Sequence, residues 1–87
     1  MNEKEQKIAD RLREILVTNL RLPMNAEDID YEEELFNSDL GLDSVDSLEI
    51  VAAIDDEYGV SLTSEHREYF KNIRTLSEII LRSIETA

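Results

Sequence analysis

The sequence has no cysteine, only two glycines, one proline and one histidine among its 87 residues. Without cysteine it can form neither disulfides nor thiolate metal sites, so any thiol that it uses must come from outside. No apolar run approaches the roughly 18 residues of a membrane span. The first residues, M-N-E-K-E-Q-K, lack the apolar core of a signal peptide. We therefore expect a cytoplasmic protein that does not insert into a membrane.

Basic residues are absent from residues 23–59, although this stretch holds 13 acidic side chains. Residues 1–22 carry five basic and four acidic side chains, and residues 60–87 carry four of each. The net charge of -12 therefore arises from the middle of the chain. This distribution argues against nucleic-acid binding and favours a basic partner protein. Solubility alone is the simpler alternative.

Enzyme signatures are also missing. His66 is the only candidate imidazole base, and nothing in the sequence brings it near a serine, so we interpret it as a surface residue. The chain has no Gly-rich phosphate loop and no zinc ligand cluster, and a solvated acidic run explains its many carboxylates. We expect a protein that enzymes act upon and that is not an enzyme itself.

The first helix is predicted from Glu3 to about Leu20, because apolar residues recur there at helical spacing. It should end near Arg21, since Pro23 disfavours helical geometry at the residue before it. Its apolar positions are Ile8, Leu12, Ile15, Leu16 and Leu20.

A long acidic loop is predicted from Met24 to Leu42, where no periodicity is sustained. Its expected hydrophobic anchors are Ile29, Leu35, Phe36 and Leu42. A calcium loop is the alternative, because Asp28, Asp30 and Glu32 occupy alternate positions. The match fails at the sixth and twelfth positions, where Glu33 stands for Gly and Asp39 for Glu, so we predict no metal site.

A second helix is predicted from Asp43 or Ser44 to Tyr58, with Gly59 as its C-terminal stop. At about 100° per residue it has two apolar faces. The predicted core face comprises Ile50, Val51, Ile54 and Tyr58. The opposite stripe comprises Val45, Leu48 and Ala52, bordered by Glu49, Asp55 and Asp56. An apolar centre with a charged rim is typical of a docking site, although another helix of the chain could also cover the stripe.

Two further helices are expected. Thr63 or Ser64 can cap a short one whose apolar side is Tyr69, Phe70 and Ile73. Thr75 and Glu78 form a capping box that predicts the start of the last helix, with a buried stripe of Leu76, Ile79, Ile80 and Ile84. The predicted fold is all-α: one domain over residues 1–87, a small four-helix bundle of three main helices and one short helix with the long acidic loop.

The segment D-L-G-L-D-S at residues 39–44, followed by V-D-S-L-E-I-V, resembles the phosphopantetheine attachment region of acyl carrier proteins. The resemblance extends over almost the whole chain. It implies that a phosphopantetheinyl transferase attaches 4'-phosphopantetheine from coenzyme A to Ser44, with Asp43 as part of the motif. Taken alone, a serine at a helix start is simply a cap.

The resemblance also implies the partners. The acidic residues Asp43, Asp46, Glu49, Asp55 and Asp56 would meet basic patches on the transferase and on acyl-processing enzymes of ketosynthase, acyltransferase or ligase type. Val45, Leu48 and Ala52 would fill the centre of the contact, and the carrier would act as a monomer. The residues implied to line the acyl chain are Val51, Ile54, Leu62, Ile73, Leu76 and Ile80, although ordinary core packing explains them equally well.

Val45 and Tyr58 stand where the family more often has Leu and Phe, and residues 62–75 form a longer stretch than usual. The D-S-V-D-S-L-E version resembles carriers of specialised polyketide, aryl polyene or unusual-lipid systems. The main rival hypothesis is an acidic interaction module without a prosthetic group, and a third is a weakly calcium-responsive helical protein. Ser47, in the second D-S pair, is a poorer attachment candidate than Ser44 because it lies inside the predicted helix.

Overall fold

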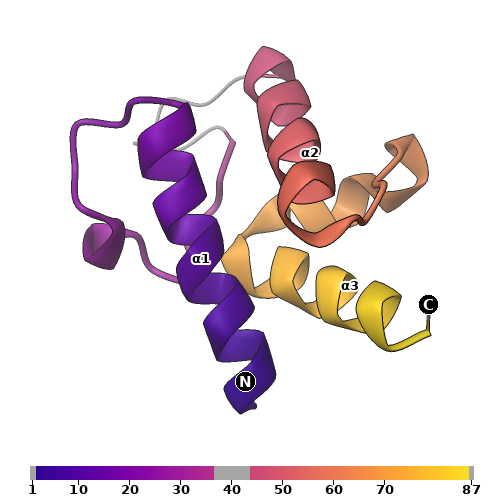
Figure 1. Ribbon diagram of the computed structural model, residues 1–87. Coiled ribbons are helices and arrows are strands. Elements are labelled where there is room, and N and C mark those ends of the chain that lie inside the picture. Colours follow the sequence, from indigo (N-terminus) through magenta and orange to yellow (C-terminus); the bar gives the residue numbers. More distant parts are fainter. Residues whose placement is uncertain (1, 37–43, 87) are drawn as a thin grey trace.

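The computed structural model describes residues 2–36 and 44–86, without the side chains of residues 44 and 64–67. Its described part is all-helical, with three α-helices and no β-strand: α1 is Glu3–Asn19, α2 is Ser44–Tyr58 and α3 is Ile73–Thr86. Two 3-10 helices, η1 at Ala26–Asp28 and η2 at Ser64–Lys71, lie between them. In Figure 1, α2 lies above α3, and α1 runs beside both.

The predicted limits of the first two α-helices are confirmed. The side chain of Asn2 accepts a hydrogen bond from Glu5 N at the start of α1, and Leu20 follows the last helical residue. Arg21, two residues before Pro23, has a positive φ of 53°. At the end of α2, Gly59 adopts φ 68° and donates from its backbone N to Asp55 O over 2.8 Å. Glycine adopts this left-handed conformation without the strain of a side chain.

The predicted start of the last helix is wrong by three residues, because the predicted cap was Thr75. α3 begins at Ile73, and Asn72 is the residue that caps it: its Oδ1 accepts from Thr75 N over 2.8 Å. Thr75 Oγ1 accepts in turn from Asn72 N over 3.2 Å, so the reciprocal box joins Asn72 and Thr75. Glu78 does not complete a box with Thr75, because its carboxylate binds Arg74 Nη1 over 2.7 Å.

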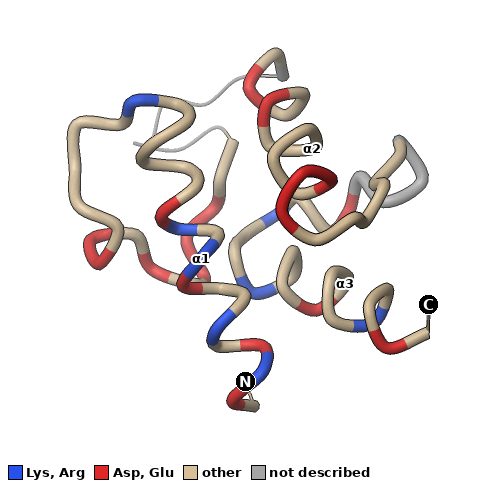
Figure 2. The backbone as a smooth tube through the Cα atoms, viewed as in Figure 1, with Lys and Arg blue, Asp and Glu red and all other residues tan. Residues whose placement is uncertain are grey.

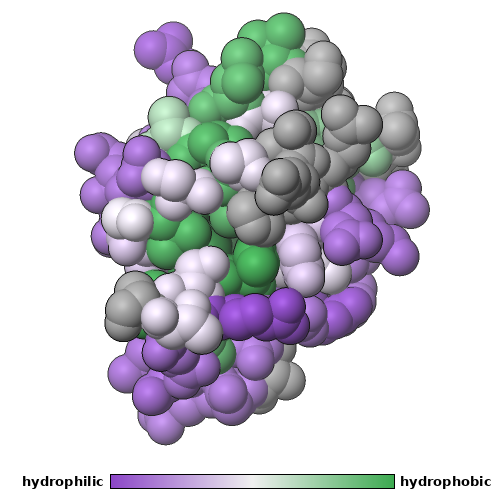
Figure 3. All heavy atoms as spheres, turned by 90° about the vertical axis from the view of Figure 1, so that its right-hand side faces the viewer, coloured by the Kyte–Doolittle hydropathy of each residue, from purple (hydrophilic) through white to green (hydrophobic). Residues whose placement is uncertain are grey.

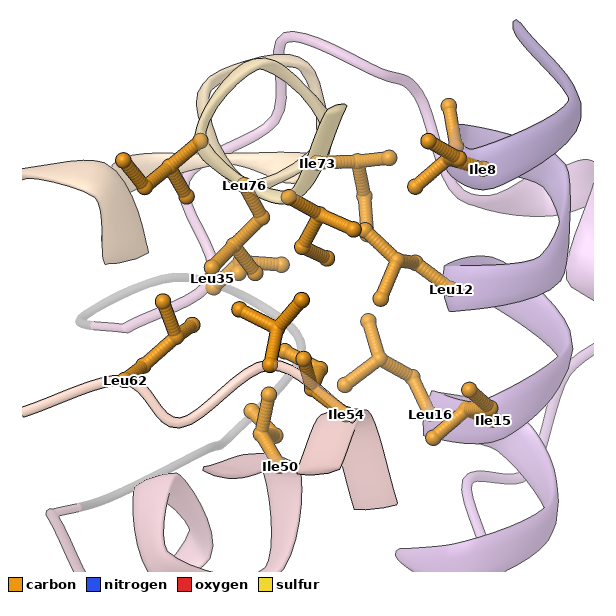
Figure 4. Close-up of a cluster of buried hydrophobic side chains, with 14 of the residues drawn as sticks. Ile8, Leu12, Ile15, Leu16, Leu35, Ile50, Ile54, Leu62, Ile73 and Leu76 are labelled. Carbon is orange, nitrogen blue, oxygen red and sulfur yellow. The ribbon is translucent and has the colours of Figure 1, made fainter. Parts of the chain in front are cut away.

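The hydrophobic core contains buried side chains from all three α-helices, and Figure 4 shows many of them converging. α1 contributes Ile8, Leu12, Ile15 and Leu16, while Leu20 is half-buried against them. On α3 the predicted buried stripe is right for Leu76, Ile79 and Ile80 and wrong for Ile84, which is exposed; Leu81 is buried instead. Ile73 is buried in α3 and not in the preceding short helix, where Tyr69 and Phe70 pack partly buried against the core.

Hydrophobic anchors hold the acidic segment from Leu22 to Phe36 against α1 and α3. Ile29 and Leu35 are fully buried as predicted, and Phe36 is half-buried, whereas Leu42 lies outside the described residues. Two backbone hydrogen bonds tie this segment to the chain around α3: Leu35 N donates to Lys71 O over 3.0 Å, and Arg74 N donates to Tyr31 O over 3.1 Å.

Arginines from the neighbouring helices supply the positive charge that this acidic segment lacks. Arg13 of α1 binds Asp10 over 2.8 Å, donates to Ile29 O over 3.1 Å and lies over the Tyr31 ring, 4.5 Å from its centroid. Arg74 of α3 binds Glu32 over 2.5 Å. The Tyr31 hydroxyl donates to Asp10, so an aromatic side chain and two cations fasten the segment to the helices.

The Tyr31–Asp10 hydrogen bond predicts a pH dependence of stability. This bond, with burial as the second cause, raises the pKa of Tyr31. The folded chain therefore holds the phenol proton more tightly than the unfolded chain, whose tyrosine pKa is about 10. The stabilisation is complete below about pH 10 and is lost as the pH rises through the folded pKa.

We expect Tyr31→Phe to lower the free energy of unfolding by about 1 kcal/mol at neutral pH, as loss of a partly exposed hydrogen bond does. The difference between the variant and the wild type should shrink as the pH rises above about 10. Urea unfolding followed by far-UV circular dichroism across this range measures both quantities. A difference that stays constant with pH would contradict the role of the Tyr31 proton.

Candidate functional site

One face of α2 attaches the helix to the core. Ile50 and Ile54 are buried, and Val51, Ala53 and Tyr58 pack partly buried against the same cluster. Figure 4 shows Ile50 and Ile54 directed toward the side chains of α1 and α3. The predicted core face is therefore confirmed, with Val51 and Tyr58 at its margin.

The opposite face of α2 presents apolar side chains to solvent. Val45 is 67% exposed and Leu48 is 69% exposed, and Ala52 is exposed one turn further along. Figure 3 shows apolar surface at the top of the view, where the N-terminal end of α2 lies. The described helices thus leave the stripe open, and an exposed apolar patch on a charged protein is a feature of interaction sites.

Carboxylates border this stripe. Glu49, Asp55 and Asp56 are exposed, and within the described residues none of the three forms an ion pair. Asp46 is half-buried in the first turn. Figure 2 shows acidic positions along α2 and no basic one. Because opposite charges accelerate encounter, the negative rim favours partners with a basic surface.

The helix start is the position of the predicted attachment serine. α2 begins at Ser44, and Ser47 lies one turn inside it. The first backbone N–H groups of an α-helix lack intrahelical acceptors, and the helix dipole makes this end electropositive. A phosphate linked to residue 44 would therefore lie where a helix favours an anion. Asp43 lies outside the described residues, as does the side chain of His66.

An ion pair joins the other end of α2 to α1. Arg11 donates from Nε and Nη2 to Glu57 Oε1 over 3.1 and 2.7 Å, and from Nη1 to Glu14 over 3.2 Å. The hydrogen bond with Glu57 is the main cause that raises the pKa of Arg11. Burial, followed by the charge of Glu57, raises the pKa of the neighbouring Tyr58.

Neither Arg11 nor Glu57 was predicted from the sequence to be a site residue. A signal was available, since three consecutive acids, Asp55, Asp56 and Glu57, occupy the last turn of α2 without any basic residue. A helix C-terminus is electronegative and favours cations, so such a turn requires a cation from elsewhere in the fold.

The residues predicted to line an acyl chain lie together in the core. Ile54, Leu62, Ile73, Leu76 and Ile80 are buried, and Val51 is half-buried beside them. Ile54, Leu62, Ile73 and Leu76 are labelled in Figure 4. A surface hollow lies elsewhere, between the start of α1 and the end of α3, where Glu5, Leu81 and Glu85 help to line it. The lining role of the six residues stays a prediction.

The carboxylates of the predicted calcium alternative make other contacts. Asp28 Oδ2 accepts from Asn25 N over 3.1 Å, Asp30 Oδ1 accepts from Glu32 N over 2.9 Å, and Glu32 pairs with Arg74. Among the residues that the structure describes, no group of three or more potential ligands is arranged to hold a metal ion. In the same residues every helix is too short or too polar to cross a bilayer.

Comparison with known proteins identifies the class of site. The model of a family described as the phosphopantetheine attachment site matches residues 10–81, so the chain is a phosphopantetheine-attachment domain. It is similar to an acyl carrier protein of Saccharopolyspora erythraea, with 35% identity over 81 residues that cover 93% of this chain and 80% of that protein.

Two further relatives carry the same description. The acyl carrier protein of Wolinella succinogenes is 34% identical over 79 residues, which cover 91% of this chain and 95% of that protein. The acyl carrier protein of Clostridium perfringens is 33% identical over 76 residues, which cover 87% of this chain and 96% of that protein. The chain belongs to the acyl carrier protein family, as the sequence motif predicted. It is therefore a carrier with a covalent 4'-phosphopantetheine group and not an enzyme.

Truncating a side chain on each face of α2 should have very different effects on the free energy of unfolding. Leu48→Ala removes an exposed side chain and should change the free energy of unfolding by less than about 0.5 kcal/mol. Ile54→Ala opens a cavity at a fully buried position and should cost about 2–5 kcal/mol. Urea unfolding of both variants measures these values. Similar losses for the two would show that Leu48 also packs in the core.

Proposed function

We propose that Ser44 bears the 4'-phosphopantetheine arm and that acyl-processing enzymes dock on the outer face of α2. The observation that carries this proposal is the joint placement of Ser44 at the start of α2 and of an open apolar stripe with an acidic rim along the same helix. An arm attached at residue 44 leaves the chain beside the surface that partners would contact.

The position of Ser44 suits a phosphate ester on physical grounds. Residue 44 opens a helix of 15 residues, so the ester's negative charge would lie at the electropositive end of the helix dipole. The arm supplies a terminal thiol that holds an acyl group as a thioester. This cysteine-free chain has no thiol of its own. We therefore propose that the thiol of the arm carries the acyl group and that the protein presents the arm to its partners.

The exposed rim of α2 suits brief encounters with several partners. Glu49, Asp55 and Asp56 lie in solvent, where ion pairs add little to affinity but increase the rate of association. Val45, Leu48 and Ala52 provide the apolar centre that a docked partner would cover. Asp43 and Asp46 lie close to Ser44 in the sequence and would contact basic side chains of the transferase.

The proposed partners are a phosphopantetheinyl transferase and enzymes of ketosynthase, acyltransferase or ligase type with basic docking surfaces. We further propose that the chain is one monomeric domain, a four-helix bundle in which η2 takes the place of the short helix and an acidic loop precedes α2. A cytoplasmic location, the absence of nucleic-acid and membrane partners, and a specialised polyketide, aryl polyene or unusual-lipid pathway stay predictions from the sequence.

Intact-mass spectrometry tests the attachment site. After incubation with coenzyme A and a broad-specificity phosphopantetheinyl transferase, we expect one covalent addition to the wild type. Ser44→Ala should abolish the addition, whereas Ser47→Ala should retain it, because Ser47 lies within α2. An unmodified wild type, under conditions that modify a control carrier, would instead support an acidic interaction module without a prosthetic group.

Charge reversal tests the docking face. Glu49→Lys with Asp56→Lys should reduce the rate of modification about tenfold at low ionic strength, because rim charges steer association. Both positions are exposed, so stability should change by less than about 1 kcal/mol in total. The effect should weaken as salt screens the charges.

The matched control reverses Glu27 and Glu34, which are exposed in the acidic segment before α2. It changes the net charge by the same amount at a distance from the proposed face. Transferase kinetics over a salt series compare the two double variants. Equal slowing by both would mean that net charge, and not the face of α2, governs association.

A further inference from the structure

The last turn of α2 has an unfavourable arrangement of charge. Asp55, Asp56 and Glu57 are consecutive, and the turn contains no basic residue. The backbone carbonyls at a helix C-terminus already make that end electronegative, so each carboxylate there opposes helix formation. Neighbouring like charges add their own repulsion. The turn therefore needs a compensating cation that α2 itself does not provide.

Arg11 of α1 supplies that cation. Two of its N–H groups converge on Glu57 Oε1, over 3.1 and 2.7 Å, and its third contact, with Glu14, holds the guanidinium from the α1 side. The positive charge thus lies at the end of α2 where helix dipole and carboxylates are both negative. Both side chains are partly exposed, at 44% and 38%, so ionic strength should weaken the pair.

The same turn connects the core to the outer face. Ile54 is buried in the turn before it, and Tyr58 is half-buried at its end. Asp55 and Asp56 are exposed between them. Arg11 pairs with Glu57 and leaves the carboxylates of Asp55 and Asp56 exposed to solvent in the same helical turn. Order in this turn therefore determines where two of the rim charges lie.

We propose that Arg11 is a positioning residue for the docking face: through Glu57 it keeps the last turn of α2 helical and holds Asp55 and Asp56 in place for a partner's basic side chains. The docking half of this proposal rests on the proposed function; the ordering of the turn does not. A partner cation at Asp55 or Asp56 relieves the same repulsion. When Arg11 is lost, binding must therefore order the turn as well, and affinity falls by that cost.

Hydrogen exchange of the free protein tests the ordering role. Arg11→Gln should raise amide exchange at residues 55–59 by about two- to tenfold and leave the centre of α1 and α3 unchanged. Arg11→Lys, which keeps a cation, should retain part of the protection. Adding Asp55→Asn and Asp56→Asn to Arg11→Gln should restore it, because these changes remove the repulsion that Arg11 offsets.

The matched control is Lys4→Gln, which removes one positive charge from α1 and breaks a longer pair with Glu85 of 3.9 Å at the other end of the molecule. It should leave residues 55–59 unchanged. Unaltered exchange in Arg11→Gln at these residues, or a uniform increase over the whole chain, would overturn the ordering role, since the latter indicates global destabilisation.

Transferase kinetics test the positioning role. Arg11→Gln should raise KM for the carrier about two- to tenfold with kcat unchanged, and the difference should narrow at high salt, which screens the Arg11–Glu57 pair of the wild type. If the wild type is modified at Ser44 and KM does not change, the positioning role is wrong and the proposed function stands. If the wild type is not modified, the proposed function is wrong, and so is the positioning role of Arg11 for the transferase. Hydrogen exchange still tests whether Arg11 orders the last turn of α2.

Discussion

Every ion pair made by residues 23–59 must use a cation from before or after this stretch, because the stretch has 13 acidic side chains and no basic one. Arg11 of α1 and Arg74 of α3 provide such cations, and Arg13 of α1 donates to the Ile29 carbonyl oxygen and lies over the Tyr31 ring. Arg13 and Arg74 fasten the acidic segment before residue 37, and Arg11 fastens the end of α2. The helices that flank the acidic stretch in the sequence are thus also the source of its charge compensation in space.

Hydrophobic burial and the Arg11–Glu57 ion pair make different contributions to the stability of α2. Ile50 and Ile54 bind the helix to the core, which is the larger contribution, since each buried aliphatic side chain is worth about 1.5–3 kcal/mol. Arg11 acts at one end, where a partly exposed ion pair is worth about 1 kcal/mol or less. The core therefore determines where the helix lies, and the ion pair determines how well its last turn is ordered.

The periodicity of the sequence predicted the features of the fold that depend on local sequence pattern. The limits of α1 and α2, the core face at Ile50 and Ile54 and the open stripe at Val45 and Leu48 all followed from spacing, proline and glycine. The family followed from the attachment motif. The start of α3 did not follow, because Asn72 and Thr75–Glu78 offer competing caps, and starting the helix after Asn72 includes the buried Ile73.

Long-range pairing could not be predicted from spacing at all. Nothing local indicates that Arg11 meets Glu57, 46 positions away, or that Arg74 meets Glu32, 42 positions away. Composition nevertheless favours pairing of this kind, because an acidic helix end without its own cation is unfavourable. A weak, exposed pair would also suit the proposed docking on α2: it would order the proposed docking face between encounters, and a partner's basic groups could replace its effect at small cost. The proposed reversible docking on α2 would therefore benefit from charge compensation that is partial and comes from another helix.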